Sequence, residues 1–128
     1  MLIRVAVGII LRDDLVFIAL RKGNQDQGGL WEFPGGKCEP SESAEIALIR
    51  ELKEECDISV TEYSFFKEIS HDYGDKKVHL LFYQVTGFEG NPIGKEGQEV
   101  RWVPVQTLSS YDFPEANLEI VDDLILSV

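Results

Sequence analysis

Three glutamates recur at helical spacing within residues 36–58, the segment GKCEPSESAEIALIRELKEECDI. Glu51, Glu54 and Glu55 stand at positions i, i+3 and i+4, so a helix would project all three side chains from one face. Like charges at this spacing repel one another and destabilise an isolated helix. The face is therefore either well solvated or neutralised by a cation, and carboxylate oxygens are the usual ligands of hard divalent metal ions.

Capping residues mark both ends of this helix. Ser43 is the expected N-cap, and Glu45 in the first turn complements the helix dipole. Asp57 is expected to end the helix, and Arg50 can pair with Glu54 at i, i+4. Apolar side chains at helical spacing are predicted to face the core: Ile46, Ile49, Leu52 or Lys53, and Cys56.

The chain has the length of one domain and a strongly acidic balance. It has no internal repeat or low-complexity linker, so we expect a single domain over residues 1–128. Its formal net charge of −11 disfavours binding to nucleic-acid polymers or anionic membranes, because both need a basic surface. A small polyanionic partner would need bound cations, which reverse the local field. We expect a monomer.

The cysteines and the first apolar segment favour a cytoplasmic location. Cys38 and Cys56 are expected to be free thiols in a reducing compartment. The apolar segment from Val5 to Leu11 is too short to span a membrane and is not followed by a small-residue cleavage site, so we predict a strand there.

Apolar runs bounded by turn residues predict the remaining elements. Strands are expected at residues 3–11, 15–20, 30–33, 63–69, 78–85 and 100–103. A short helical turn is expected at 105–108, and a closing helix at 116–126 built on Leu118, Val121, Leu124 and Ile125. The order β-β-β-α-β-β-β-α predicts an α/β fold, with a mixed sheet covered by helices.

The spacing of the fixed residues in segment 36–58 is similar to a known family signature. Gly36 is followed after five residues by Glu42, after seven more by Arg50-Glu51-Leu52, after one more by Glu54-Glu55, and after two more by Ile58. This pattern resembles the signature box of the Nudix hydrolases. It departs from that box at Asp57, where the family has a glycine in the left-handed region after the helix, a conformation that Asp also tolerates.

Further segments resemble the MutT branch of this family, so the resemblance covers most of the chain: residues 5–10, 30–37, 94–98 and 112–117. It implies the Nudix α/β/α sandwich, with a mixed β-sheet between helices. It also implies an enzyme that hydrolyses 8-oxo-dGTP to the monophosphate and pyrophosphate with Mg²⁺ or Mn²⁺, and so removes a mutagenic nucleotide from the precursor pool.

The resemblance assigns catalytic roles residue by residue. It implies metal ligands at Glu51, Glu54, Glu55 and Glu96 and at the backbone carbonyl of Gly35, with Arg50 holding the carboxylates in place. Such ligands suit phosphoanhydride hydrolysis, which needs neutralised phosphate oxygens and an activated water. We favour Glu51 as the general base, with Glu96 as its competitor, and expect Glu42 to organise the loop.

The resemblance also implies contacts to the nucleotide. Asn117 can donate to and accept from a guanine edge, Phe33 can offer an apolar face, and Arg21 and Asp75 fall at matching positions. Structural roles compete with these assignments, because Asn117 can be a helix cap, Phe33 a core aromatic and Arg21 a solvated charge.

Two alternatives remain open. The first is a Nudix hydrolase for another nucleotide, such as a CTP or dCTP derivative, since the segment from Leu30 to Phe33 is shared by several branches. The second is a non-catalytic Nudix-like module that binds a nucleotide. Such modules tend to lose the carboxylates of the box, whereas this chain keeps them.

Overall fold

β1 (Leu2–Arg12) is the strand on which the others assemble in this computed structural model, which describes residues 1–23 and 28–127. It pairs in parallel with β6 (Lys77–Glu89) and antiparallel with β4 (Gly35–Lys37) and, at its end, with β2 (Leu15–Leu20). The path of the sheet is β3-β2-β1-β6-β5, and β7 pairs with β2. The prediction of a mixed sheet is confirmed.

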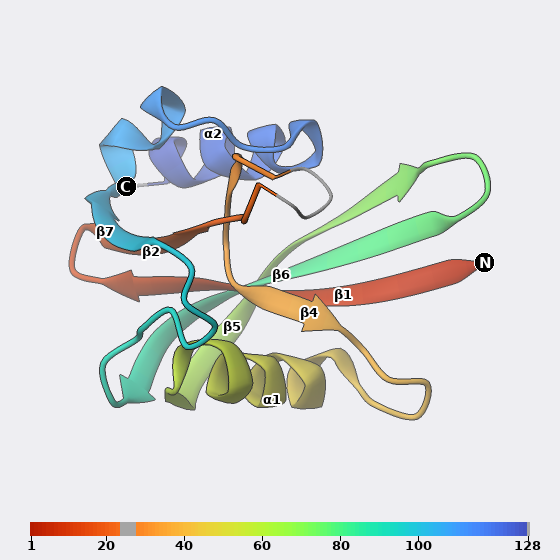
Figure 1. The fold of residues 1–128 in the computed structure, drawn as a ribbon, viewed down its shortest axis with the longest axis horizontal. Helices are drawn as coiled ribbons and strands as arrows, with labels where there is room; N and C mark the ends of the chain where they lie inside the picture. Colours follow the sequence, from red (N-terminus) through yellow and green to blue (C-terminus); the bar gives the residue numbers. More distant parts are fainter. Residues whose placement is uncertain (24–27, 128) are drawn as a thin grey trace.

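Helices cover both faces of this sheet (Figure 1). α1 (Ala44–Cys56) lies on one face, while α2 (Leu118–Leu126) lies on the other, with the 3₁₀ helices η1 (Val105–Ser110) and η2 (Glu115–Asn117). The remaining strands are β3 (Trp31–Glu32), β5 (Ser59–Asp72) and β7 (Val100–Pro104). This is the expected α/β/α sandwich.

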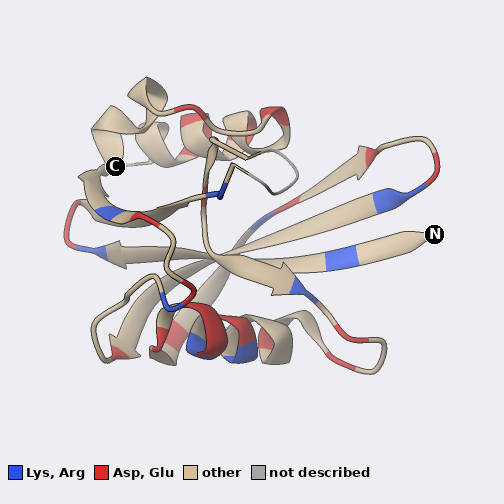
Figure 2. Cartoon of the chain, in the orientation of Figure 1, with Lys and Arg blue, Asp and Glu red and all other residues tan. Residues whose placement is uncertain are grey.

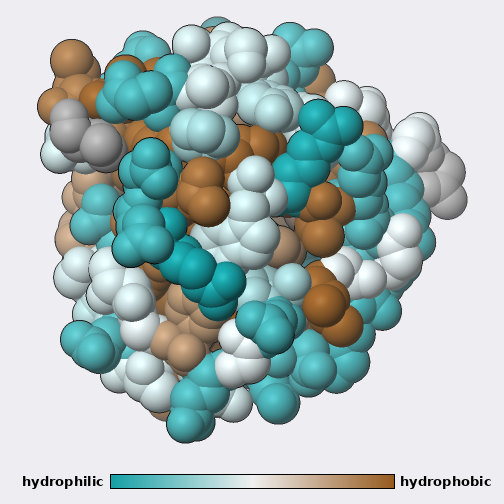
Figure 3. Space-filling view, turned by 90° about the vertical axis from the view of Figure 1, so that its left-hand side faces the viewer, coloured by the Kyte–Doolittle hydropathy of each residue, from teal (hydrophilic) through white to brown (hydrophobic). Residues whose placement is uncertain are grey.

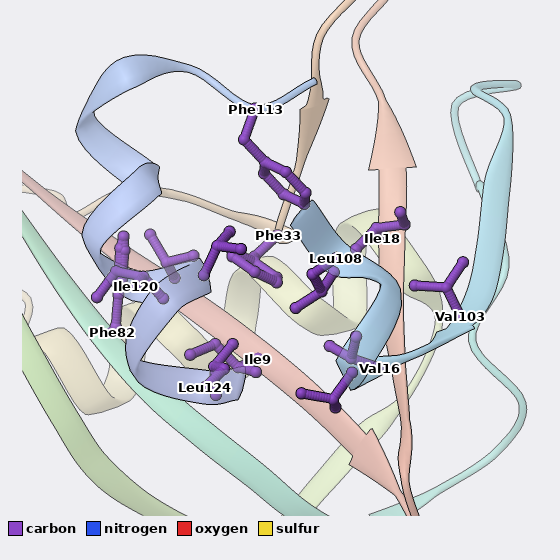
Figure 4. Close-up of a cluster of buried hydrophobic side chains, with 13 residues drawn as sticks. Ile9, Val16, Ile18, Phe33, Phe82, Val103, Leu108, Phe113, Ile120 and Leu124 are labelled. Carbon is purple, nitrogen blue, oxygen red and sulfur yellow. The ribbon is translucent and has the colours of Figure 1, made fainter. Parts of the chain in front are cut away.

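Two hydrophobic cores lie on opposite faces of the sheet, and alternation along β1 supplies both. Ala6 and Ile10 pack on the α1 side, whereas Val7 and Ile9 pack on the α2 side. Figure 4 shows the α2-side core, which includes Ile9, Val16, Ile18, Phe82, Leu108, Ile120 and Leu124. The α1-side core includes Phe17, Leu48, Leu52, Ile58 and Val85.

Both ends of α1 have the predicted caps. The Ser43 hydroxyl accepts a hydrogen bond from the Ile46 amide at 3.2 Å. Asp57 adopts φ 60° and ψ 37°, the left-handed conformation expected where the family signature has glycine. Its amide donates to the carbonyls of Leu52 and Lys53, which closes the last turn.

The prediction that Ile46 and Ile49 face the core is wrong. Their side chains are 59% and 40% exposed, and the buried face of α1 consists of Ala44, Ala47, Leu48, Leu52 and Cys56. Leu52 and Cys56, from the same prediction, are buried as expected. In the first half of the helix the small side chains of Ala44 and Ala47 face the core in place of the two isoleucines. Leu118, the first residue of α2, is also exposed, at 49%, and Ile120 packs in the core instead.

Acidic and basic side chains are distributed unevenly over the molecule. Figure 2 shows Asp and Glu gathered along α1 and on the neighbouring loop that precedes β7. On the face at the left of Figure 1, hydrophobic and hydrophilic side chains are intermixed (Figure 3). Cys38 and Cys56 are free thiols, as predicted. No helix within the described residues is long and apolar enough to span a membrane.

Candidate active site

Two cavities adjoin and share part of their walls. The first, here called the acid cavity, has a volume of about 480 Å³ and contains four carboxylates in its wall: Glu32, Glu51, Glu55 and Glu96. The second, here called the apolar cavity, has a volume of about 330 Å³ and is lined by Val5, Val7, Phe33, Leu80 and Phe82, with Asn117 and Tyr73 among its polar residues. Arg21, Glu32 and Gly35 line both cavities.

The phase of α1 determines which of its glutamates enter the acid cavity. Glu51 and Glu55 lie three and seven residues after the buried Leu48, so they share its face and line the cavity. Glu54 is not among the lining residues, and its side chain is 62% exposed. The structure therefore brings together three of the four predicted carboxylate ligands, Glu51, Glu55 and Glu96, and leaves Glu54 at the outer side of the helix.

Two glycines let the helix carboxylates approach the backbone of β4. A Cβ added to Gly36 would clash with the carboxyl group of Glu51, so any other residue at this position would displace that carboxylate. The Gly35 amide hydrogen-bonds the Glu55 carboxylate. The backbone of Gly35 and Gly36 therefore lies beside the carboxylates of Glu55 and Glu51.

Backbone hydrogen bonds position Glu96 beside the helix. The Lys95 amide donates to the Glu55 carbonyl at 3.1 Å, and the Ile93 amide donates to the Cys56 carbonyl at 3.1 Å. The last turn of α1 thus binds the loop between β6 and β7, which explains why acidic residues of the two segments appear together in Figure 2.

Glu32 is a residue of the acid cavity that the sequence analysis did not select. It lies on β3, where its Oε1 accepts a hydrogen bond from Arg21 Nη1 at 2.7 Å. Burial raises the pKa of Glu32, the Arg21 guanidinium opposes this shift, and the charge of Glu96 adds to it. In the sequence, the one indication of a role for Glu32 is its place two positions before Pro34. Only the fold brings Glu32 into the same cavity as Glu96.

The acid cavity disfavours its own negative charge. Burial, followed by the charges of Glu32, Glu51 and Glu96, raises the pKa of Glu55 to about 8. Within the described residues no three acidic, histidine or cysteine side chains converge as a ready set of metal ligands. The donors are nonetheless hard oxygens in a site where a cation would relieve the repulsion, so the chemistry of the residues fits Mg²⁺ or Mn²⁺.

Arg50 links the loop before α1 to the helix carboxylates. Its Nε and Nη2 donate to the two carboxylate oxygens of Glu42 at 2.7 and 2.8 Å, and its Nη1 donates to Glu51 at 2.8 Å. The predicted pairing with Glu54 is confirmed, at 3.3 Å. These hydrogen bonds from Arg50 lower the pKa of Glu42 to about 2. Glu42, which also accepts from the Glu39 amide, organises the loop as expected.

The apolar cavity contains two of the predicted nucleotide contacts. Phe33 is 4% exposed and stacks on Phe113 at 5.1 Å, so it is both a core aromatic and part of the cavity wall. Asn117 stands at the N-cap position of α2, yet its side chain makes no capping hydrogen bond. The competing role as a helix cap therefore does not occupy its amide, which lines the cavity.

Arg21 and Asp75 differ in their placement. Arg21 lines both cavities and pairs with Glu32, so it stands at their junction. Asp75 is exposed in the turn between β5 and β6, where it lines a separate shallow hollow with Met1 and Leu2. The structure does not bring Asp75 into either cavity.

Sequence comparisons agree with this arrangement. The NUDIX domain family matches residues 6–123. The chain belongs to the NUDIX domain family, which confirms the prediction made from the signature box.

Individual relatives extend the comparison to the MutT branch. The chain is 37% identical over 123 residues to the 8-oxo-dGTP diphosphatase of Escherichia coli strain K12, covering 95% of each protein. It is 34% identical over 121 residues to the CTP pyrophosphohydrolase of the same strain, covering 94% of this chain and 90% of the relative. A solved MutT structure from a study of Aliivibrio salmonicida and Vibrio cholerae superposes with a TM-score of 0.92 at 41% identity, over 100% of both chains.

Proposed function

We propose that this protein is an 8-oxo-dGTP diphosphatase that uses Mg²⁺ or Mn²⁺. The observation that supports this proposal is the junction of the two cavities at Arg21, Glu32 and Gly35. A nucleoside triphosphate has a flat base and a polyanionic tail. The apolar cavity suits the base, and the acid cavity, once it holds cations, suits the phosphates.

The metal would be held by Glu51, Glu55 and Glu96 together with the Gly35 carbonyl. Glu54 remains a proposed fourth carboxylate, on the grounds of the family resemblance alone. When bound, a divalent ion supplies charge neutralisation on the phosphate oxygens and lowers the pKa of a coordinated water.

The side chains of the site divide the remaining tasks. Glu51 is our proposed general base, because Arg50 holds one of its oxygens and so orients the other toward the cavity. Glu96 is its competitor, on a loop bound to the same helix. Arg50 is a positioning residue, since it reaches the reaction through Glu51.

Base recognition would use Phe33 and Asn117. The Asn117 amide can donate and accept at once, which matches the edge of an oxidised guanine, while the Phe33 ring packs against an apolar face of the nucleoside. Arg21, at the junction, would contact the sugar or the first phosphate. We propose no contact from Asp75, given its position outside both cavities.

A second candidate substrate is a cytidine nucleotide. The CTP pyrophosphohydrolase of E. coli is 34% identical to this chain, close to the 37% of the 8-oxo-dGTP diphosphatase. Sequence identity to these two relatives therefore does not by itself distinguish between the two substrates. The presence of Asn117 in the wall of the apolar cavity favours the guanine nucleotide.

A substrate panel tests the proposal. We expect pyrophosphate release with Mg²⁺ to give a higher kcat/KM for 8-oxo-dGTP than for dGTP, CTP or dCTP. A preference for CTP would support the second candidate. Nucleotide binding without any pyrophosphate release would instead identify a non-catalytic module. We further propose that the protein acts on free nucleotides in the cytoplasm as a monomer, in keeping with its net charge of −11.

A further inference from the structure

The loop of residues 90–99, which carries Glu96, depends on bonds from its neighbours for its shape. It contains three glycines, and two of them, Gly90 and Gly97, have φ values of 97° and 85°. Glycines in this region give the backbone many accessible conformations. The Glu96 carboxylate therefore has a defined position only if contacts with other segments fix the backbone of the loop.

Three backbone bonds hold the flanks of this loop. The amides of Ile93 and Lys95 donate to carbonyls in the last turn of α1, and the Leu20 amide donates to the Glu99 carbonyl at 2.9 Å. These bonds fall on residues 93, 95 and 99. They fix the path of the loop on either side of Glu96. None of the three reaches the peptide between residues 96 and 97, whose Gly97 amide donates to the Gly94 carbonyl within the same loop at 2.9 Å.

A side chain from the segment that follows β2 reaches that peptide. The Lys22 ammonium group donates to the backbone carbonyl of Glu96 at 2.7 Å, across 74 positions of sequence. A Cβ added to Gly97 would lie 3.9 Å from Lys22 Nζ, so the ammonium group sits directly against the peptide between residues 96 and 97. The Glu96 amide meanwhile donates to the Gln98 side chain at 3.0 Å, within the same loop.

We infer that Lys22 is a positioning residue for the reaction: its bond to the Glu96 carbonyl fixes where the Glu96 carboxylate stands in the acid cavity. The inference rests on the proposed function, since it assigns Glu96 a part in the chemistry. Lys22 also lines the acid cavity, whose wall contains the four carboxylates. A small displacement of a catalytic carboxylate is costly, because reaction rates depend steeply on the alignment of the reacting groups.

Three variants test this role. Lys22→Met removes the ammonium donor and keeps a chain of similar length, whereas Lys22→Arg keeps a cationic donor. Lys95→Met is the matched control, because it removes one positive charge from the same loop. The Lys95 side chain is half exposed and lies 3.8 Å from Asp57, outside the acid cavity, and its backbone bond to α1 is unaffected by the substitution.

The first measurement needs neither metal nor substrate. In the metal-free protein, we expect amide hydrogen exchange over residues 94–99 to be several-fold faster in Lys22→Met than in wild type, because the open conformations of the loop become more populated. Exchange in Lys22→Arg and Lys95→Met should match wild type. Unchanged exchange in Lys22→Met would overturn the inference.

The second measurement is steady-state kinetics with the preferred nucleotide. We expect Lys22→Met to lower kcat by about 10-fold with KM changed by less than about 3-fold, and Lys22→Arg to recover most of the loss. A raised KM with an unchanged kcat would overturn the inference, since it would mark Lys22 as a direct phosphate contact. Wild-type protein that hydrolyses no nucleotide would refute the proposed function instead, and the exchange measurement would still test the contact between Lys22 and the loop.

Discussion

The two cavities differ in how their walls are built. The acid cavity takes Glu51 and Glu55 from one helix, and the network from Glu42 through Arg50 to Glu51 lies within ten residues of sequence. The apolar cavity takes its wall from strands far apart in sequence and from the residue before α2. Local spacing thus specifies the helix carboxylates of the acid cavity, whereas tertiary packing adds Glu32 and Glu96 to it and shapes the cavity that selects a base.

The helix that bounds the apolar cavity is itself held by an ionic contact. Lys67 on β5 pairs with Glu119 at 2.7 Å and also with Asp123, one turn later on α2. This contact adds to the packing of Ile120, Val121 and Leu124 in the core, which holds α2 against the sheet. In the acid cavity, hydrogen bonds between the last turn of α1 and the loop of residues 90–99 hold the helix and the loop together.

The largest expected effect concerns the acid cavity. Glu51→Gln should lower kcat by about 10²–10⁴-fold, because the general base and a metal ligand are lost together while the shape of the side chain is kept. Glu54→Gln on the outer side of α1 should cost about 10-fold or less, since its carboxylate is exposed and paired with Arg50. Pyrophosphate release with Mg²⁺ measures both effects.

Equal losses in Glu51→Gln and Glu54→Gln would mean that Glu54 turns inward when metal binds, as the family resemblance implies. If Glu51→Gln hydrolyses the nucleotide as fast as wild type, the proposed active site is wrong. Circular dichroism of both variants checks that the helix remains folded.

The next effect concerns the apolar cavity. Asn117→Ala should reduce the preference for 8-oxo-dGTP over dGTP by about 10-fold or more, because a buried edge of the base loses its hydrogen-bonding partner. Stability should change little, since the Asn117 side chain makes no capping hydrogen bond. Asp75→Asn is the control and should keep wild-type selectivity. Unaltered selectivity in Asn117→Ala would contradict the oxidised-guanine assignment.

The smallest effect is a change of stability with pH in the metal-free protein. The pKa of Glu55 is about 8 in the folded state against an ordinary value of 4.5, so the folded protein holds a proton that the unfolded chain releases between these values. The free energy of unfolding contributed by this group therefore falls as pH rises from about 4.5 to about 8. Glu55→Gln should abolish this dependence.

Calorimetry in the presence of a chelator measures the difference. We expect the Tm of Glu55→Gln to exceed that of wild type by roughly 3–8 °C at pH 8 and to equal it near pH 4. Glu39→Gln, an exposed acid outside the cavity, should show no such gain. A Tm difference that is the same at both pH values would show that repulsion at Glu55 is not its cause.

Features of the site that depend on residues close together in the sequence were predicted, whereas features that depend on distant segments were not. The caps of α1, the left-handed Asp57 and the Arg50–Glu54 pair depend on neighbouring residues, and all three were predicted. Periodicity alone gave the wrong phase for Ile46, because a helical period does not say which side the sheet will cover. Glu32 was missed, since an isolated acid on a two-residue strand carries no local pattern.

The sequence alone therefore determined the family, the helix with its carboxylates and every strand except β4, because each depends on spacing along the chain. Only the tertiary structure decided which glutamates share a cavity. It turned Glu51 and Glu55 inward and Glu54 outward, and it brought Glu32 and Glu96 to face them. The physical reason is that burial and charge repulsion arise between side chains in space, and the packing of α1 and its neighbouring loop on the sheet sets those distances.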